Sequence, residues 1–229
     1  MIKKIGTVVG LSIVLVTILL AVGSCKVEET GQLAPVEVRE YQGQKLSSVN
    51  DFQENSIKGP QHVDIKSYKL SITGLVKSPM EYTYDQVVQN YKSYEKVVTL
   101  NCVEGWSATT LWKGLLVRDL IAEAGPLPEA KVIIFHAYDG YTTSFPVEYI
   151  LNNDILMAYH MNGAALLPER GFPFQLVAES KWGYKWVKWI TRIELSDDVN
   201  YRGYWEQRGY SNTGDLDKEF FFKGFFDND

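Results

Sequence analysis

Short stretches of alternating apolar and polar residues recur along the chain, and each predicts a β-strand with one buried face. The predicted strands cover residues 68–73, 97–102, 131–138, 141–145, 174–178 and 186–195. Asp139-Gly140 between two of these stretches is a hairpin signal, and Asn162-Gly163 is a second turn signal. The pattern therefore predicts short strands joined by tight turns.

Two stretches have the spacing and end signals of helices instead. Thr83 with Gln86 three residues later fits a capping box, which predicts a short helix over residues 84–91. Residues 115–124 have one apolar face, and Gly125 is placed to end that helix. Both helices are short, and the apolar face of the second is predicted to belong to the core.

The pattern changes at the N-terminus, where Lys3 and Lys4 precede an apolar run over residues 5–22. The run ends in Val-Gly-Ser directly before Cys25, which resembles the lipobox of bacterial lipoproteins. We therefore predict a signal peptide over residues 1–24, acylation of Cys25, and a lipid anchor at the extracytoplasmic face of a bacterial or archaeal cell membrane. An uncleaved N-terminal helix is the alternative.

Length and composition favour one domain after this segment. The chain has 229 residues, of which 45% are hydrophobic and 13% aromatic, enough to bury one sizeable core. Residues 25–45 are polar and lack a period, which predicts a tether, so the domain is expected over residues 46–229. The net charge of −5 comes without a Lys/Arg block, and no nucleic-acid partner is expected.

The chain has two cysteines, Cys25 and Cys102. Because the first is assigned to the export signal, Cys102 has no partner in a compartment that favours disulfides, and it is either buried inertly or used. A thiol nucleophile or redox sensor is one such use, but it requires a nearby base or cation. The histidines are not spaced as a metal trio and receive no role: His62, His136 and His160.

Cys102 lies in the first of several separated motifs. In chain order these are Cys102-Val103-Glu104-Gly105-Trp106, Trp112-x-Gly114, Asp139-Gly140-Tyr141, Ala158-Tyr159-x-Met161-Asn162-Gly163, Gly171-Phe172-Pro173 and Lys185-Trp186-Val187-Lys188-Trp189. Together they resemble the oxidoreductase molybdopterin-binding domain of sulfite oxidases and periplasmic methionine-sulfoxide reductase catalytic subunits, over residues 46–211. The resemblance is closer to the reductase branch, and it implies an α+β fold, mixed and mostly β, of the sulfite-oxidase type with short helices.

The resemblance implies molybdopterin and molybdenum as cofactors, with Cys102 in the position of the thiolate ligand of the metal. A soft, electron-rich sulfur suits this metal, while the cofactor carries the electron transfer. The other implied cofactor-binding residues are Asn50, Gln53, Glu54, Arg170, Gln175, Trp186, Val187 and Lys188. The family commonly has arginine where this chain has Gln175, so one positive charge is missing, and Arg170 is the hypothesised replacement.

The implied activity is that of a molybdenum-dependent oxidoreductase that moves an oxygen atom or two electrons, with S-oxide reduction as one possibility. The expected substrate is a small molecule or an oxidised side chain, and Tyr141, Tyr204 and Trp205 are predicted to line its entrance. A separate redox protein, membrane haem- or quinone-linked, is the expected partner. The chain is expected to act as a monomer, because it ends too soon for a dimerisation or haem domain.

A cofactor-free lipoprotein that keeps the fold as a binding module is the alternative function. Members of the family that load molybdopterin in the cytoplasm are usually exported folded by the twin-arginine route. The n-region here has Lys3-Lys4 and no Arg-Arg pair. An unfolded export route would deliver an empty pocket.

Overall fold

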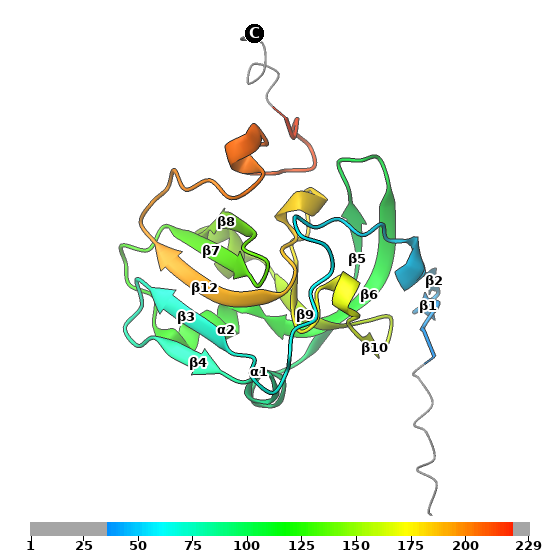
Figure 1. Ribbon diagram of the computed structural model, residues 1–229, viewed down its shortest axis with the longest axis horizontal. Helices are drawn as coiled ribbons and strands as arrows, with labels where there is room; N and C mark the ends of the chain where they lie inside the picture. Colours follow the sequence, from blue (N-terminus) through cyan, green and yellow to red (C-terminus); the bar gives the residue numbers. More distant parts are fainter. Residues whose placement is uncertain (1–35, 222–229) are drawn as a thin grey trace, which may run out of the picture. The chain divides into compact units, whose positions relative to one another are not determined.

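The computed structural model describes residues 36–221 (Figure 1). The predicted signal peptide, Cys25 and the tether up to residue 35 lie outside the described residues. In the described part of the chain, most strands belong to two five-stranded sheets. No helix within residues 36–221 is long and apolar enough to span a bilayer.

The first sheet has the strand order β10-β9-β6-β5, and β11 also pairs with β9. All its pairings are antiparallel. Its strands are β5 (Tyr94–Asn101), β6 (Ser107–Leu116), β9 (Leu156–Met161), β10 (Ala164–Ala165) and β11 (Gln175–Val177). β5 and β6 form a long hairpin whose last pair is Asn101 with Ser107, so the turn between these residues lies at the end of both strands.

The second sheet has the order β4-β3-β12-β7-β8 and is mixed, because β12 pairs in parallel with β3 and antiparallel with β7. Its strands are β3 (Leu70–Gly74), β4 (Met80–Tyr82), β7 (Val132–Ala137), β8 (Thr142–Pro146) and β12 (Ile190–Ser196). A separate two-stranded ribbon precedes both sheets and consists of β1 (Glu40–Tyr41) and β2 (Gln44–Lys45).

Both sheets contribute to a single core. Trp112 of β6 and Phe135 of β7 are fully buried in the same cluster of apolar side chains. The helices are α1 (Tyr84–Asn90), α2 (Val117–Ala124) and α3 (Val147–Asn152). Leu120 and Ile121 of α2 are fully buried, as the predicted apolar face requires. Burial of such side chains is the main source of the stability of the fold.

Several local predictions are confirmed. Thr83 and Gln86 form both hydrogen bonds of the capping box at α1. Gly125 ends α2 with a φ of +66°, a conformation that glycine adopts without strain. The hairpin at Asp139-Gly140 joins β7 to β8. These features depend on residues close in sequence, which is why the pattern predicts them.

Several boundaries differ from the prediction by a few residues, and two of these differences have a clear physical reason. Residues 115–116 belong to β6 rather than to a helix, and β6 was not predicted because most of its side chains are buried and do not alternate with polar ones. Residues 186–189 are not part of a strand, because a 3-10 turn precedes them and Trp189 has a φ of +51°, which interrupts an extended chain. The strand β12 therefore begins at Ile190.

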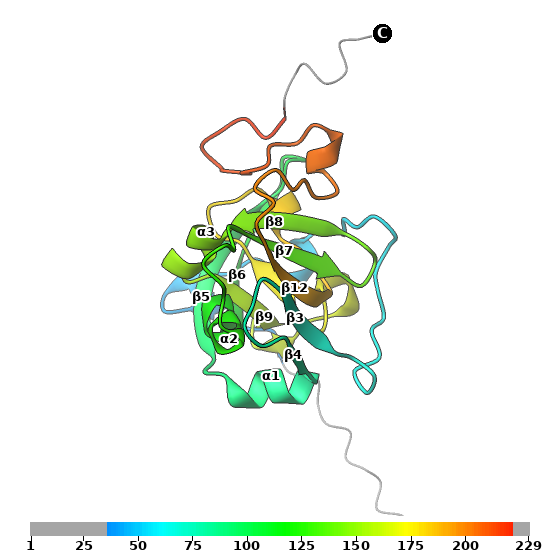
Figure 2. The same ribbon diagram turned by 90° about the vertical axis from the view of Figure 1, so that its left-hand side faces the viewer.

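Three irregular segments surround the motif residues. The N-terminal arm, residues 36–48, leads into the cavity loop, residues 49–57, and the C-terminal strap comprises residues 201–221. Figures 1 and 2 show this strap at the end of the domain opposite α1. Short 3-10 turns lie in or beside these segments: η1 (Val49–Asp51), η2 (Pro168–Arg170), η3 (Gly183–Lys185) and η4 (Glu206–Arg208).

Candidate active site

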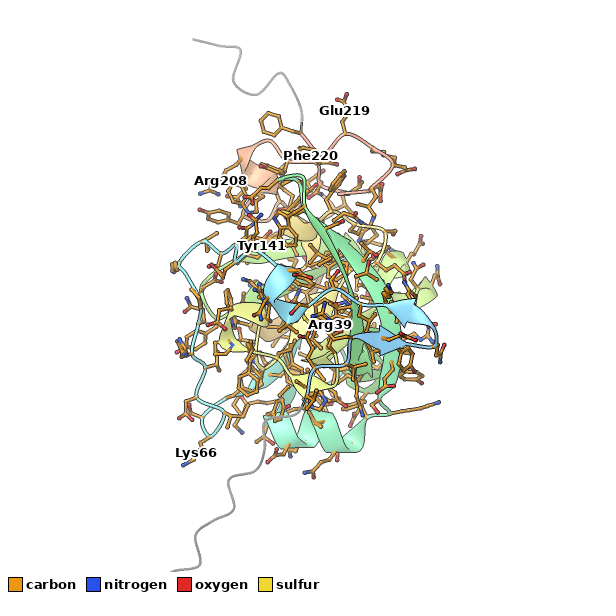
Figure 3. All side chains as sticks on the ribbon, turned by 90° about the vertical axis from the view of Figure 1, so that its right-hand side faces the viewer. Arg39, Lys66, Tyr141, Arg208, Glu219 and Phe220 are labelled. Atoms are coloured by element: carbon orange, nitrogen blue, oxygen red, sulfur yellow. The ribbon has the colours of Figure 1, made fainter. Side chains whose placement is uncertain are left out.

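A cavity of about 320 Å³ lies where these segments meet. Its walls come from the cavity loop, the turn after β5, the β7–β8 hairpin, the region from η2 to β11, the region from η3 to Trp189, and the strap. In Figure 3 Tyr141 of the hairpin lies between the cavity loop and the strap, which carries Arg208 and Phe220. The site therefore collects side chains that are far apart in the sequence.

Cys102 is placed by the tight turn that joins β5 to β6. Its N–H donates to Trp106 O over 2.9 Å, and Gly105 N–H donates back to Cys102 O over 3.1 Å. Gly105 has a φ of +87°, so a side chain there would strain the turn. The thiol is free, 7% exposed, and lies on the cavity wall.

The environment of this thiol is not that of an activated nucleophile. Burial raises the pKa of Cys102, and the negative charge of Glu104 adds to this, while hydrogen bonds from backbone N–H groups and from Asn55 lower it. Asn55 Nδ2 lies 3.5 Å from Cys102 Sγ and 3.0 Å from Glu104 Oε2. A catalytic thiolate needs an adjacent cation or base that lowers its pKa, and here the net effect is to raise it.

Among the described residues, two cationic side chains lie on the cavity wall, and Lys188 is the first of them. Its Nζ lies 2.7 Å from Glu54 Oε1 and 3.2 Å from Glu169 O, and 4.3 Å from the centre of the Trp189 ring. Burial lowers the pKa of Lys188, although Glu54 acts in the opposite direction. The amine is held in place by a partly buried ion pair that an anionic ligand could replace.

Arg170 is the second cationic side chain, but its donors bind the backbone of the cavity loop. It donates to Val49 O over 3.1 Å, to Phe52 O over 2.7 Å and to Gln53 O over 3.4 Å. Its guanidinium lies 5.4 Å from the Phe52 ring centre. Arg170 thus holds the cavity loop through its backbone carbonyl groups.

Unpaired polar groups line the same cavity. Trp106 Nε1 and Ser56 Oγ are buried without a hydrogen-bond partner among the described residues, and the side-chain amide of Gln175, 4% exposed, also has none. A Cβ on Gly183 would lie 3.2 Å from Leu100 Cδ2, 3.3 Å from Asn101 O and 3.5 Å from Cys102 Cα, so glycine allows the backbone here to approach the residues that lead into Cys102. Unpaired donors next to open space are the groups expected of a ligand site.

Aromatic residues form the wall nearest the strap. The Tyr141 hydroxyl donates to Tyr184 O, and Trp205 and Tyr210 line the cavity beside them. The Tyr210 hydroxyl has no hydrogen-bond partner among the described residues. Burial raises the pKa of Tyr210, and the charges of Glu104 and Cys102 raise it further, so this hydroxyl stays protonated.

The structure brings most of the predicted site residues together. Those that line the cavity are Gln53, Glu54, Cys102, Tyr141, Arg170, Gln175, Trp186, Val187, Lys188 and Trp205. Asn50 does not, because it is exposed in η1 and its N–H is bound to Ser48 Oγ. Tyr204 does not either, and its ring packs between Tyr141 and the guanidinium of Arg208.

Other cavity residues were not predicted. They include Asn55, Ser56, Asp139, Gly183, Tyr184 and Tyr210. Asp139 and Tyr184 lie within or beside the motifs, so proximity in sequence could have identified them. Tyr210 is one aromatic among many near the C-terminus, and only the three-dimensional structure separates it from the others.

Comparison with known proteins gives concordant matches. A model of the oxidoreductase molybdopterin binding domain matches residues 57–205. The uncharacterized oxidoreductase YuiH of Bacillus subtilis is 35% identical over 157 residues, which are 68% of this chain and 78% of that protein. YedZ1 of Azospira oryzae, named as a protein-methionine-sulfoxide reductase subunit, is 30% identical over 154 residues, which are 67% of this chain and 58% of that protein.

A solved structure gives a similar result. The sulfane dehydrogenase SoxCD from Paracoccus pantotrophus superposes with a TM-score of 0.59 at 25% identity, covering 63% of this chain and 42% of that one. Plant NADH nitrate reductases also match, but the alignment spans only 18 to 20% of their length. The shared part is therefore one domain of several larger proteins.

Proposed function

This chain belongs to the oxidoreductase molybdopterin-binding domain family, and from that membership we propose roles for its cavity residues, a substrate class and a cellular location. The predicted enzyme class, a molybdenum-dependent oxidoreductase, and the predicted cofactor, molybdopterin with molybdenum, are confirmed. The predicted α+β fold, mostly β and of the sulfite-oxidase type, is confirmed as well.

The residues of the cavity fit such a cofactor. A volume of about 320 Å³ is at the lower end of the roughly 300–1,000 Å³ of small-molecule sites. Trp106 Nε1 and Ser56 Oγ are donors without partners, which a pterin ring rich in acceptors can use. Gly183 allows η3 to pack closely against the end of β5 that leads into Cys102. Metal, ring and phosphate each have candidate partners among these residues.

Cys102 is assigned as the protein ligand of the metal. The observation that carries this assignment is a free, nearly buried thiol on the cavity wall, close to unpaired donors. The raised pKa of Cys102 does not oppose it, because a metal cation deprotonates a coordinating thiol. When bound, the molybdenum–molybdopterin group supplies the two-electron redox change.

Lys188 is assigned to the phosphate of the cofactor. Its ammonium is held over the Trp189 ring and paired with Glu54, so it is already directed into the site. A phosphate is a stronger hydrogen-bond acceptor than the single Glu54 oxygen that Lys188 contacts, so the phosphate is expected to replace that oxygen as the partner of Lys188. Gln53, Trp186 and Val187 complete this part of the wall, and Gln175 offers a neutral amide.

The substrate is assigned as a neutral S-oxide. Glu104 and Asp139 line the cavity. Neither of the cationic side chains that the structure describes on its wall is left for the substrate, because Arg170 binds the backbone of the cavity loop and Lys188 is assigned to the cofactor phosphate. An oxyanion would meet carboxylates without a free cation, whereas a sulfoxide needs only a hydrogen-bond donor. Similarity to YedZ1, named for methionine-sulfoxide reduction, supports the same class.

Reduction of an S-oxide breaks the S–O bond, consumes two electrons and two protons, and releases a sulfide and water. The protonated Tyr210 hydroxyl is placed to donate a hydrogen bond to the substrate oxygen, because it lines the cavity and has no partner among residues 36–221. Glu104, held by Asn55, also lines the cavity. Tyr141 and Trp205 enclose the substrate.

The enzyme is proposed to work outside the cytoplasm, anchored by lipid on Cys25. The support is the Val-Gly-Ser-Cys25 sequence after an apolar run. In this proposal the protein is a monomer, and a separate redox protein at the membrane supplies the electrons. Domain boundaries at residues 25 and 46 are part of the same proposal.

Metal and pterin analysis tests the central assignment. The protein purified from the membranes of its own host is expected to contain about one molybdenum per chain and to release a fluorescent pterin, while Cys102→Ser loses turnover and changes the metal spectrum. With reduced viologen as electron donor, methionine sulfoxide should be consumed and nitrate should not. Absence of both metal and pterin from the native protein would contradict the proposal.

A further inference from the structure

Glu37 of the N-terminal arm connects three segments. Its Oε1 accepts hydrogen bonds from Val49 N–H over 2.6 Å and from Asn162 Nδ2 over 2.8 Å, and its Oε2 accepts one from Ser48 Oγ over 3.0 Å. The carboxylate is 24% exposed. Burial alone would raise the pKa of Glu37, but the hydrogen bonds outweigh burial and lower it. Charge-assisted bonds of this kind are the stronger ones.

Asn162 gives this carboxylate a rigid attachment point. It is fully buried, its backbone has a φ of +49°, and its side chain is fixed on both sides. Oδ1 accepts from Leu111 N–H over 2.9 Å, and Nδ2 also donates to Ser47 O over 2.9 Å. Val38 N–H donates to Asn162 O over 2.9 Å, so the arm is bound here by its backbone as well. Glu37 is thereby connected to β6 of the first sheet.

The other end of the contact is the start of the cavity loop. Ser48 caps η1, accepting from Asn50 N–H, and its own N–H donates to Asp51 Oδ2 over 2.6 Å. Beyond η1 no helix or strand occurs among the described residues until β3, although residues 52–57 all line the cavity. The position of this wall therefore depends on a few side-chain contacts. Glu37 makes the contacts at the start of the cavity loop, with Ser48 and Val49.

We propose that Glu37 is a positioning residue for cofactor binding: by joining Ser48 and Val49 to Asn162, it holds the cavity loop in the arrangement that receives molybdopterin. The inference rests on the proposed function, because it concerns the same cavity. Without the contact, the loop would have to be ordered when the cofactor binds, and the entropy lost in that ordering would weaken binding. The arm is thus part of the support of the site rather than a mere tether.

The test compares Glu37→Ala with Glu37→Gln and with Glu40→Ala. Glutamine keeps the oxygen that accepts from Val49 and Asn162, so it should restore most of the function that alanine loses. Glu40 lies on the same arm, is exposed and has no side-chain bond among the described residues, which makes it a matched control. We expect roughly ten-fold weaker retention of molybdenum and pterin in Glu37→Ala after gel filtration, and near-native retention in the other two.

Two readouts separate positioning from general destabilisation. Chymotrypsin should cleave after Phe52, which is 6% exposed, in Glu37→Ala and not in Glu37→Gln or Glu40→Ala. Thr83→Ala, which removes the cap of α1, serves as a destabilised control, because no residue of α1 lines the cavity. Chains of Glu37→Ala that keep the metal should show the native molybdenum spectrum, since Glu37 is not a ligand.

Three results would overturn the inference. These are native cofactor retention in Glu37→Ala, equal cofactor loss in Thr83→Ala at the same melting temperature, and unchanged cleavage after Phe52. A native protein without molybdenum would instead reject the proposed function. In that case the cleavage pattern of the metal-free variants still decides whether Glu37 holds the loop.

Discussion

The N-terminal flank, residues 36–56, and the C-terminal strap both complete the cavity, and most of each lies outside the segment 57–205 that matches the family. They are attached by different physical means. The flank is held by hydrogen bonds between charged side chains and backbone groups at half-exposed positions, whereas the strap is held by an ion pair with no exposed surface. One wall of the cavity is therefore expected to depend on contacts that matter for ligand binding, and the other on a contact that matters for the stability of the whole fold.

The attachment of the strap centres on Lys185 and Glu206. Lys185 Nζ lies 2.6 Å from Glu206 Oε1, and both side chains are fully buried. The same ammonium donates to Ser144 O and to Asn212 O, and Thr143 Oγ1 donates to Glu206 Oε1 over 2.6 Å. Burial lowers the pKa of Lys185, which Glu206 opposes. Removing either charge would leave the other buried and uncompensated.

The largest effect is therefore expected from Lys185→Met. A buried charge without its partner destabilises a protein by about 3–5 kcal/mol, so the metal-free protein should unfold at much lower urea concentration. The measurement is the free energy of unfolding from urea titration followed by tryptophan fluorescence and circular dichroism.

Two variants sharpen this prediction. In Lys185→Met/Glu206→Leu no buried charge remains, and much of the stability should return. Lys218→Met removes an amine that is 62% exposed on the same strap and should leave the free energy of unfolding nearly unchanged. If Lys185→Met and Lys218→Met behaved alike, the strap would not be held as described.

A smaller effect is expected from Arg170→Lys on the flank. Lysine keeps the charge but cannot reach Val49 O, Phe52 O and Gln53 O together, because that requires the planar fork of arginine. The loss of these bonds should cost about 1–3 kcal/mol, and hydrogen exchange should become faster in the cavity loop.

The matched control is Arg118→Lys on α2, where the arginine makes a surface ion pair with Asp154. It should leave both stability and exchange nearly unchanged. Faster exchange throughout the domain in Arg170→Lys, rather than in the cavity loop, would remove the distinction between flank and strap.

The parts of the fold that could be predicted from the sequence are those decided by near neighbours. The capping box at Thr83, the hairpin at Asp139-Gly140 and the stop at Gly125 each depend on residues within a few positions. The strand β6 was missed because burial on both faces removes the alternation that identifies a strand. The break at Trp189 follows from tertiary contacts, among them its Nε1 donating to Pro168 O.

The residues of the candidate site likewise fall into those that local motifs identify and those that only long-range contacts bring together. Cys102 and Lys188 could be predicted because their motifs keep a characteristic order, and the structure places both on the cavity wall. The contact of Glu37 with Asn162 joins residues 125 positions apart, and nothing in the local sequence indicates it. Lys185 lay in a motif, yet its partner Glu206 lies in a segment without any period. Long-range polar contacts of this kind become visible only in three dimensions.

The smallest effect concerns the outer end of the strap, where Asp215 pairs with Lys181 and lies 2.8 Å from Lys218 Nζ. Although burial acts to raise it, hydrogen bonds from these two lysines lower the pKa of Asp215 to about 2. Because the folded pKa is below the unfolded value, this carboxylate stabilises the fold above about pH 4, and the contribution is lost as pH falls toward about pH 2. With solvent screening it should amount to about 1 kcal/mol.

Asp215→Asn should remove that part of the acid dependence of unfolding, while Asp217→Asn, exposed on the same strap, should not. If the stability of Asp215→Asn and Asp217→Asn depended on pH in the same way, Asp215 would not be the source of this acid dependence. The buried ion pair of Lys185 and Glu206 would then be the contact that holds the strap.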